Sequence, residues 1–436
     1  MKITILNGNP DQSNNAFDQY LKQLTQILIA GQHQVTQLNL RDLDISYCIG
    51  CFGCWVKTPG ECRSADESEQ VCRAVINSDF TLWAAPLQLG FPSALLKKAL
   101  DKFIPLVHPY IVVDQQEAHH LARYERYPRF GLLLQKEADT DDDDLRIVTD
   151  VFSRTALNLK SRLEFRHTTD QPVAALVAAM TTLTPARLKL SDRLTPTNGV
   201  QITPPQRLTV FNGSPRGRKG NTPLMLEHFL NGFTANSDHT FEIYHLNRIK
   251  EAEHFQQAFA AAEGVLLGFP LYTDAMPGIV KAFIETLTPF RQRAGNPPIG
   301  FLVQSGFPEA AHSRHIERYL EKLAQRLKSP YLGTIVKGGG EGIRIMPEKM
   351  THNMFQTLYQ LGKVFGETGC FEASLLRQLA KPERYPAVLA PFFQVFLKTR
   401  QARWYWDMQL KESGAFERRF AQPYTHESRV VPESSH

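Results

Sequence analysis

The chain has 436 residues, of which 42% are hydrophobic and 21% are charged, and its formal net charge is +5. This composition is that of an ordinary globular protein, and it excludes a disordered or fibrous class. The length exceeds what one core usually supports and predicts two domains. No apolar run approaches the roughly 20 residues of a membrane span, and basic residues are scattered, so we expect a cytoplasmic protein that binds no nucleic acid.

A short apolar run followed by Asn-Gly-x-Pro occurs twice, at residues 7–10 and again at 212–215. Three further segments recur in the same order, pairing 86–106 with 270–290, 128–135 with 297–304 and 159–161 with 327–329. The chain is therefore predicted to be one fold repeated in tandem. The first copy carries about 21 extra residues between its first and second matched blocks and about 15 more before its third, and we expect these in loops.

Strands and helices alternate in both copies. The first copy begins with a predicted strand at 2–6, then an amphipathic helix through Phe17, Leu21 and Leu24, and later strands at 81–85 and 129–134 around a helix at 93–103. The second copy has predicted strands at 207–211, 264–268, 299–304 and 331–336. This alternation predicts an α/β fold with doubly wound parallel sheets.

The predicted domain boundaries follow from the repeat. We expect a first domain at 1–182 with a Cys-rich insertion, a linker at 183–206, a second domain at 207–370 and a C-terminal helical extension at 371–436. The linker is assigned because it is rich in proline and lacks an apolar period. The aromatic residues of the extension have helical spacing, which favours packing on the protein's own core over a membrane-surface helix.

The turn at 213–222 has the composition of a phosphate-binding loop. Ser214, Asn221 and Thr222 offer side-chain donors, Arg216 offers a planar fork and Lys219 a point charge. A turn that enters a helix also directs backbone N–H groups and the helix dipole at one point. The alternative is a plain strand-to-helix connection that uses glycine for its backbone angles alone.

The Gly-Ser-Pro-Arg and Asn-Thr elements of this turn, together with 270–277, resemble the flavodoxin-like NAD(P)H-dependent FMN reductase family. The resemblance implies two tandem flavodoxin-like domains with five-stranded parallel sheets, FMN as cofactor and NAD(P)H as electron donor. It also implies that the first loop holds the FMN phosphate and that a second loop lies along the isoalloxazine ring and offers it backbone amides. That second loop consists of Pro270, Leu271, Tyr272, Thr273 and Asp274.

The first copy departs from the family pattern because Asp11 stands where an arginine is expected, and a carboxylate repels phosphate. It still keeps five side-chain donors, Asn9, Gln12, Ser13, Asn14 and Asn15, and the flavin-loop segment Pro86, Leu87, Gln88, Leu89 and Gly90. FMN is therefore predicted in the second copy, and a second FMN in the first copy stays open. The segment 338–342, which follows the last strand of the second copy, is either a third cofactor-lining loop or a plain turn.

Four of the six cysteines, Cys48, Cys51, Cys54 and Cys62, lie within fifteen residues. Three thiolates at intervals of three plus a fourth nearby suit the corners of one cubane cluster. The motif resembles that of the iron–sulfur flavoproteins, a branch of the same family, and this resemblance implies a [4Fe–4S] cluster. The alternatives are a structural zinc ion and empty thiols retained from an ancestor.

We therefore predict an FMN-dependent NAD(P)H oxidoreductase that passes electrons to a small acceptor such as flavin or quinone. FMN carries the redox chemistry, so no catalytic side chain is assigned. The alternatives are a flavin and iron–sulfur electron carrier that serves partner proteins, and a non-enzymatic redox sensor. Relatives of this fold commonly bind flavin near a dimer interface, which suggests an internal pseudo-dimer or a homo-oligomer.

Overall fold

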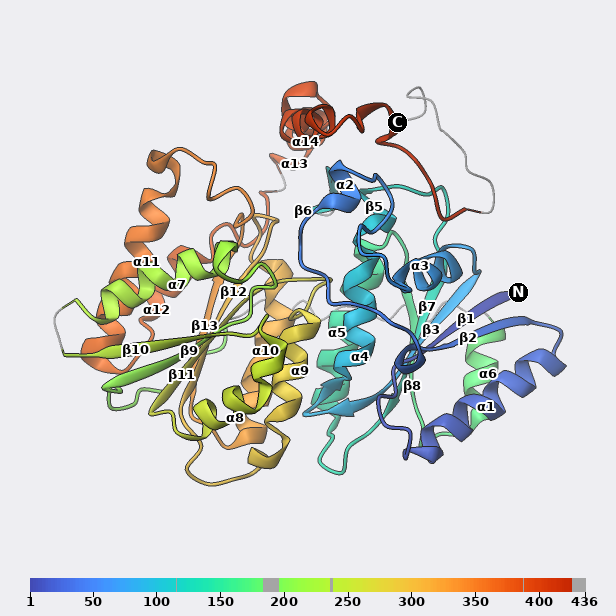
Figure 1. Cartoon of the computed structure of the whole chain (residues 1–436), viewed down its shortest axis with the longest axis horizontal. Helices are drawn as coiled ribbons and strands as arrows, with labels where there is room; N and C mark the ends of the chain where they lie inside the picture. The colour runs from blue at the N-terminus through green and yellow to red at the C-terminus, as the bar shows by residue number, and fades with distance from the viewer. Residues whose placement is uncertain (115, 183–195, 236–237, 387, 426–436) are drawn as a thin grey trace. The chain divides into compact units, whose positions relative to one another are not determined.

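A computed structural model describes residues 1–114, 116–182, 196–235, 238–386 and 388–425 (Figure 1). The chain divides into two compact units. Unit 1 is formed by Met1–Ser191 together with Pro386–His436, and unit 2 is formed by Asp192–Tyr385. Unit 1 contains the first copy of the repeat and unit 2 the second.

Unit 1 is built on five parallel strands in the order β2-β1-β3-β7-β8, the flavodoxin-like order. A two-residue strand, β4 (Phe91–Pro92), adds to β3 in antiparallel register. The parallel strands are β1 (Lys2–Asn7), β2 (Gln34–Asn39), β3 (Phe80–Gln88), β7 (Arg129–Gln135) and β8 (Leu163–Thr168). The accompanying helices are α1 (Asn15–Ala30), α3 (Ser68–Ile76), α4 (Ala94–Leu100), α5 (Asp142–Asn158) and α6 (Val173–Thr181).

Unit 2 repeats this order with five parallel strands, β10-β9-β11-β12-β13. They are β9 (Arg207–Asn212), β10 (Thr240–His245), β11 (Gly264–Pro270), β12 (Ile299–Gln304) and β13 (Tyr331–Lys337). The helices are α7 (Asn221–Phe233), α8 (Ala252–Ala260), α9 (Gly278–Thr286), α10 (Ala311–Leu327), α11 (Glu348–Thr368) and α12 (Ala373–Leu379). The predicted fold, a tandem pair of flavodoxin-like α/β sheets, is confirmed.

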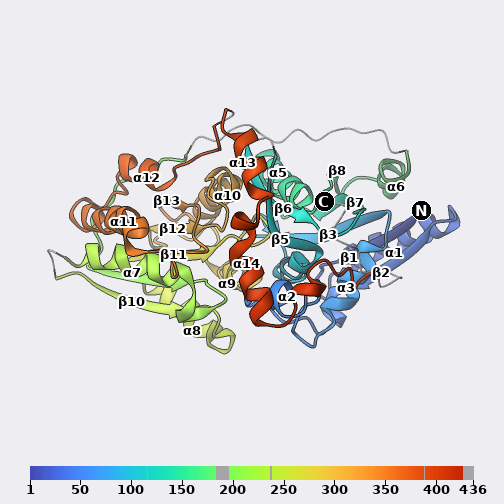
Figure 2. The ribbon, with the colours of Figure 1, turned by 90° about the horizontal axis from the view of Figure 1, so that it is seen from above.

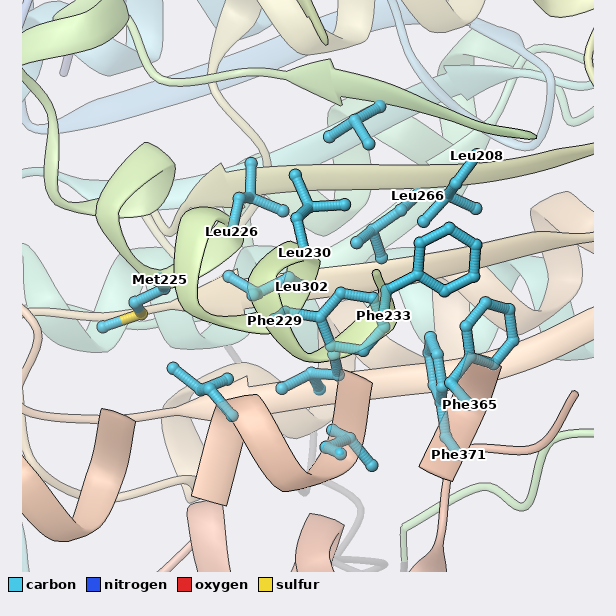
Figure 3. Close-up of a cluster of buried hydrophobic side chains, with 14 of the residues drawn as sticks. Leu208, Met225, Leu226, Phe229, Leu230, Phe233, Leu266, Leu302, Phe365 and Phe371 are labelled. Carbon is cyan, nitrogen blue, oxygen red and sulfur yellow. The ribbon is translucent and has the colours of Figure 1, made fainter. Parts of the chain in front are cut away.

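The core of unit 2 fixes helix α7, whose first turn forms part of the candidate site. Phe229, Phe233, Phe365 and Phe371 are buried side by side between α7, α11 and the sheet (Figure 3). The two helices approach so closely that a Cβ on Gly362 would lie 1.8 Å from the carbonyl oxygen of Phe229. Close helix packing therefore fixes α7 against α11 and the sheet.

The two length excesses of the first copy take different forms. The first contains two single-turn helices, η1 (Leu40–Asp42) and α2 (Gly53–Val56), on either side of the first cysteine of the motif. The second contains an antiparallel hairpin of β5 (Val107–Asp114) and β6 (Glu117–Ala122), so neither excess is the plain loop that we expected. The hairpin was missed because its residues show no clear alternation of apolar and polar side chains.

The segment predicted as a C-terminal extension is shared between the units. Helix α12 packs on α11 and β13 in unit 2. Helices α13 (Ala390–Leu397) and α14 (Arg400–Glu412) and the turn η6 (Phe416–Arg418) belong to unit 1, where α14 lies beside α2 and β5 (Figures 1 and 2). Of the predicted linker, residues 183–195 lie outside the described residues, and the rest contacts unit 2, where Val200 N donates to Tyr331 O at 2.8 Å.

Among the described residues, no helix combines the length and the apolar character that a membrane crossing requires.

Candidate functional site

The predicted phosphate loop of unit 2 connects β9 to α7 and is tied to the sheet at its start. Gly213 N donates to Gly268 O on β11 at 2.7 Å, and Ser214 N donates to Asn212 Oδ1 at 3.0 Å. Ser214 and Thr222 are both buried. The Thr222 hydroxyl has no hydrogen-bond partner in the described structure. A buried polar group without a partner is costly, so this hydroxyl points to an absent ligand.

Glycine is required inside this loop. A Cβ on Gly220 would lie 2.0 Å from Ser214 Oγ, and Gly217 has φ +57°, in the left-handed region. The loop therefore folds tightly over the first turn of α7. Arg216 is half-buried and Lys219 is exposed, so the two predicted cations lie at the rim of the loop.

The glycine-rich segment after β13 lies against the phosphate loop. Asn221 Nδ2 donates to Gly340 O at 2.7 Å and to Glu341 O at 2.9 Å, and Arg344 Nε donates to Gly220 O at 3.2 Å. The side-chain amide of Asn221 therefore connects the phosphate loop to the glycine-rich segment. Glu341 also pairs with Arg216 at 3.1 Å. Burial raises the pKa of Glu341, and Arg216 opposes this rise.

The predicted flavin loop of unit 2 is a tight turn after β11. Leu271 N donates to Gln304 O at 2.7 Å, and Tyr272 and Ala275 exchange backbone hydrogen bonds of 2.8 and 3.0 Å. Thr273 and Asp274, at the two central positions, have φ of 41° and 60°. Two consecutive left-handed residues define a type I′ turn. Pro270, Leu271, Tyr272, Thr273 and Asp274 are thus brought to the carboxyl edge of the sheet, beside the phosphate loop that follows β9.

The corresponding donors of unit 1 are engaged by neighbouring side chains. Asn9 Nδ2 donates to Asp18 Oδ1 at 3.2 Å, Ser13 Oγ donates to Asp11 Oδ1 at 2.7 Å, and Asn14 Nδ2 donates to Gln135 Oε1 at 2.6 Å. Gln12 and Asn15, the other two predicted donors, are exposed.

The predicted flavin loop of unit 1 is also a tight turn, and a carboxylate occupies it. Leu89 and Gly90 have φ of 50° and 77° and form the centre of a turn like that of unit 2. Pro86, Leu87 and Gln88 directly precede this turn. Leu89 N donates to Glu137 Oε1 at 2.9 Å, and Gly90 N donates to Glu137 Oε2 at 2.7 Å. One side chain thus accepts from both central amides of the turn.

The four motif cysteines gather in unit 1. Cys54 is buried, Cys48 and Cys62 are half-buried and Cys51 is exposed. Burial raises the pKa of Cys54 well above its usual value, and the nearby Cys48, Cys62 and Cys51 raise it further. Within the described residues, no three His, Cys, Asp or Glu side chains form a group able to hold a metal ion. A single zinc ion needs thiolates within about 4 Å of one another, whereas the corners of a cubane cluster lie farther apart.

Two buried cations lie beside these thiols. Lys102 Nζ is 3.6 Å from Cys62 Sγ and 2.8 Å from Asp66 Oδ2. Arg123 is buried near Cys54, and within the part of the chain that the structure describes its guanidinium donates only to backbone carbonyls. Positive charge of this kind favours thiolates over thiols and thus favours metal binding.

The C-terminal segment of unit 1 covers the thiol segment. Cys62 N donates to the Tyr424 hydroxyl at 3.3 Å, and Ser413 Oγ donates to the carbonyl of Val56. The Trp406 ring packs edge-on against Phe52 and Trp55, with centroid distances of 5.4 and 5.3 Å. Sequence reasoning missed this cover because its contacts join residues more than 300 positions apart.

The strand order defines a doubly wound α/β protein of the flavodoxin type. The model of the NADPH-dependent FMN reductase family matches residues 1–115 and 206–337, and the chain belongs to this family. The two matches fall on the two copies of the repeat, and the predicted family is confirmed.

Two curated relatives are iron–sulfur flavoproteins. The protein from Archaeoglobus fulgidus is 29% identical over 108 residues, which cover 25% of this chain and 48% of the relative. The protein from Methanocaldococcus jannaschii is 27% identical over 106 residues, which cover 24% of this chain and 53% of the relative. The chain thus spans about half the length of the curated relatives it matches.

Similar solved structures include an azoreductase from Bacillus anthracis, which is 14% identical. The match covers 36% of this chain and 99% of that chain, with a TM-score of 0.30. Another is the Trp repressor binding protein from Bacillus subtilis, which is 19% identical. That match covers 35% of this chain and 96% of that chain, with a TM-score of 0.29.

Proposed function

We propose that the protein is an FMN-dependent NAD(P)H oxidoreductase that passes electrons to a small acceptor such as flavin or quinone. One observation carries the proposal. The buried hydroxyl of Thr222, without a partner in the described structure, lies at the first turn of α7 in a loop that also buries Ser214. A phosphate group at this point would complete its hydrogen bonding.

The phosphate would be held by the N-terminus of α7 with Ser214 and Thr222, and Arg216 and Lys219 would add positive charge at the rim. The partial positive charge of a helix N-terminus and its free N–H groups favour an anion. Asn221 keeps the glycine-rich segment in place over the loop through its bonds to Gly340 and Glu341.

The turn at 272–275 would bind the ring system. Residues Pro270 to Asp274 follow β11 at the edge where ligands of open sheets bind. Bound FMN would supply the redox chemistry by accepting hydride from NAD(P)H. The chain's own task is to bind and orient both nucleotides, and no protein group is assigned a proton-transfer step.

Cys48, Cys51, Cys54 and Cys62 would hold a [4Fe–4S] cluster in unit 1. The mutual proximity of the thiols and the adjacent Lys102 and Arg123 support this assignment. If the cluster is bound, the second candidate function, an electron carrier that serves partner proteins, gains support, because a cluster exchanges single electrons.

The test is FMN binding by the full chain. Thr222→Val keeps the shape of the side chain and removes the hydroxyl, so FMN affinity should fall on the order of tenfold or more. Thr357→Val is the matched control, because the Thr357 hydroxyl already donates within α11, to Asn353 O at 2.6 Å. Unchanged FMN affinity in Thr222→Val would refute the assigned phosphate site.

Turnover separates the enzyme from its alternatives. An oxidoreductase should oxidise NAD(P)H with added flavin or quinone, whereas a redox sensor should bind FMN without turnover. A carrier should show cluster absorbance after anaerobic purification. Pairing of the two copies as a pseudo-dimer and a cytoplasmic location stay predictions.

A further inference from the structure

Four of the differences between the matched cofactor loops of the two copies bear on anion or flavin binding. The strand ends and helix starts align the copies, because β1 ends at Asn7 and β9 at Asn212, while α1 begins at Asn15 and α7 at Asn221. The ends of β7 and β12, at Gln135 and Gln304, align the later segment. The matched pairs, with unit 1 first, are Asp11 with Arg216, Ala16 with Thr222, Asp18 with Leu224 and Glu137 with Gly306.

At the phosphate loop, unit 1 has no counterpart of the Arg216 cation or of the Thr222 hydroxyl, and it gains the carboxylate of Asp18. Asp18 accepts hydrogen bonds from Asn7 at 2.9 Å, from Asn9 at 3.2 Å and from Arg41 at 2.7 Å. Burial opposes ionisation of Asp18, but the hydrogen bonds from Arg41, Asn7 and Asn9, together with the charge of Arg41, outweigh it and the pKa of Asp18 is lowered. A stable carboxylate therefore takes the amide of Asn9, a donor that a phosphate in unit 1 would need.

Unit 1 also lacks the hydroxyl that marks the site in unit 2. The second residue of α1 is Ala16, which offers no side-chain donor, whereas the second residue of α7 is Thr222. The arginine position carries Asp11, whose pKa is lowered by hydrogen bonds from Ser13. Both changes disfavour an anion in unit 1.

At the flavin loop, Glu137 accepts from both central amides of the turn in unit 1, at 2.9 and 2.7 Å. A flavin edge would have to displace a carboxylate that holds two charge-assisted hydrogen bonds. The matched residue of unit 2 is Gly306, which has no side chain to place there. A Cβ on Gly306 would have one neighbour within 4 Å, Glu341 Cβ at 3.7 Å.

The cysteines are distributed in the opposite way. Unit 1 carries all four motif cysteines and Cys72, and unit 2 carries Cys370 alone. We propose that the duplicated copies have divided the cofactors: unit 1 has closed its flavin site with the carboxylates of Asp18 and Glu137 and keeps the thiol site, while unit 2 alone binds FMN, one molecule per chain. This inference rests on the FMN site proposed for unit 2.

The experiment is a titration of the full chain with FMN, read by flavin fluorescence and by the flavin to protein ratio after gel filtration. We expect one FMN per chain. Gly306→Glu copies the carboxylate of unit 1 into unit 2 and should abolish binding, whereas Gly306→Ala should retain the ratio of one. A ratio of two, or a retained FMN in a folded Gly306→Glu variant, would overturn the proposal.

A second pair of variants decides the matter even if Gly306→Glu does not fold. Thr222→Val should weaken the single site at least tenfold, and Asn14→Ala, in the phosphate loop of unit 1, should leave affinity and ratio unchanged. FMN lost from Asn14→Ala but not from Thr222→Val would place the flavin in unit 1 and overturn the division. If the unaltered chain binds no FMN, the proposed function fails instead.

Discussion

Arg123 donates a hydrogen bond to the carbonyl oxygen of Ala421 at 3.0 Å, across 298 positions of the chain. Its other hydrogen bonds reach the carbonyls of Pro105, Val107 and Arg419, and none of its partners in the described residues is a carboxylate. Arginine stays protonated in proteins, so unit 1 buries a positive charge that backbone dipoles alone solvate. The acidic groups that act on it most strongly are Tyr124 and Cys54.

The charge of Arg123 should matter more when the thiols bear negative charge than when they are protonated. We expect Arg123→Met to lower the thermal midpoint more in chain reconstituted with iron and sulfide than in metal-free chain, because an anionic centre needs a counter-charge. The measurement is the pair of midpoints for each variant. Arg126→Met, which removes an exposed cation paired with Asp79, is the control and should affect both forms equally. Equal losses in Arg123→Met would assign Arg123 a packing role only.

The buried pair of Asp66 and Lys102 predicts acid sensitivity in unit 1. Both side chains are almost fully buried, at 3% and 2% exposure. Burial opposes ionisation, yet the hydrogen bonds from Lys102 and Ser68 lower the pKa of Asp66 to about 2. Because the pKa is lower in the folded state, the stabilisation is complete above pH ~4 and is lost as the pH falls towards 2, by on the order of 2 kcal/mol.

Urea unfolding between pH 6 and pH 2 measures this contribution. Asp66→Asn should be less stable than the parent chain at pH 6, and its stability should fall less steeply below pH 4. Asp143→Asn is a suitable control, since Asp143 forms a half-exposed pair with Arg146. A parallel pH dependence in Asp66→Asn and the parent would argue against the predicted linkage.

The six thiols should differ sharply in reactivity in metal-free protein. Cys51 is exposed. Burial raises the pKa of Cys48 to about 12 and that of Cys72 beyond the usual range, so both stay protonated at pH 8. Since the thiolate is the nucleophile, iodoacetamide at pH 8 should modify Cys51 first and leave Cys48, Cys54 and Cys72 unmodified until the chain unfolds. Peptide mass spectrometry of timed samples checks this order, and early modification of Cys54 would contradict the burial of the segment.

Local sequence patterns predicted the elements whose chemistry is local. The Asn-Gly-x-Pro turns, the buried strands and the spacing of Phe17, Leu21 and Leu24 depend on neighbours within one strand–turn–helix unit, so the sheets and the turns that follow β9 and β11 could be predicted directly. The two turns lie at one edge of the sheet because parallel strands end there. The sequence therefore sufficed to predict the fold. It also sufficed to place Ser214, Thr222 and Pro270 to Asp274 at this edge of the sheet.

Contacts between segments far apart in the chain could not be predicted from local sequence patterns. Glu137 closes the turn at Leu89 and Gly90 from 47 positions away, and nothing around Glu137 marks it as a ligand for that turn. Likewise, helical spacing showed that the C-terminal aromatics pack on a core without showing which core. Trp406 packs against Phe52 and Trp55 of unit 1, a choice set by tertiary complementarity.

The phosphate loop of unit 2 should be intolerant of a side chain at Gly220. An added Cβ would lie 2.0 Å from Ser214 Oγ and 2.9 Å from Ser214 Cβ, so the loop must shift away from the start of α7. We expect Gly220→Ala to lose FMN binding and to cost roughly 1–3 kcal/mol of unfolding free energy. Gly306→Ala, whose Cβ would meet only Glu341 Cβ at 3.7 Å, is the matched control and should change neither. Denaturant unfolding and FMN titration of both variants test this, and full FMN affinity in Gly220→Ala would show that the loop is not the phosphate site.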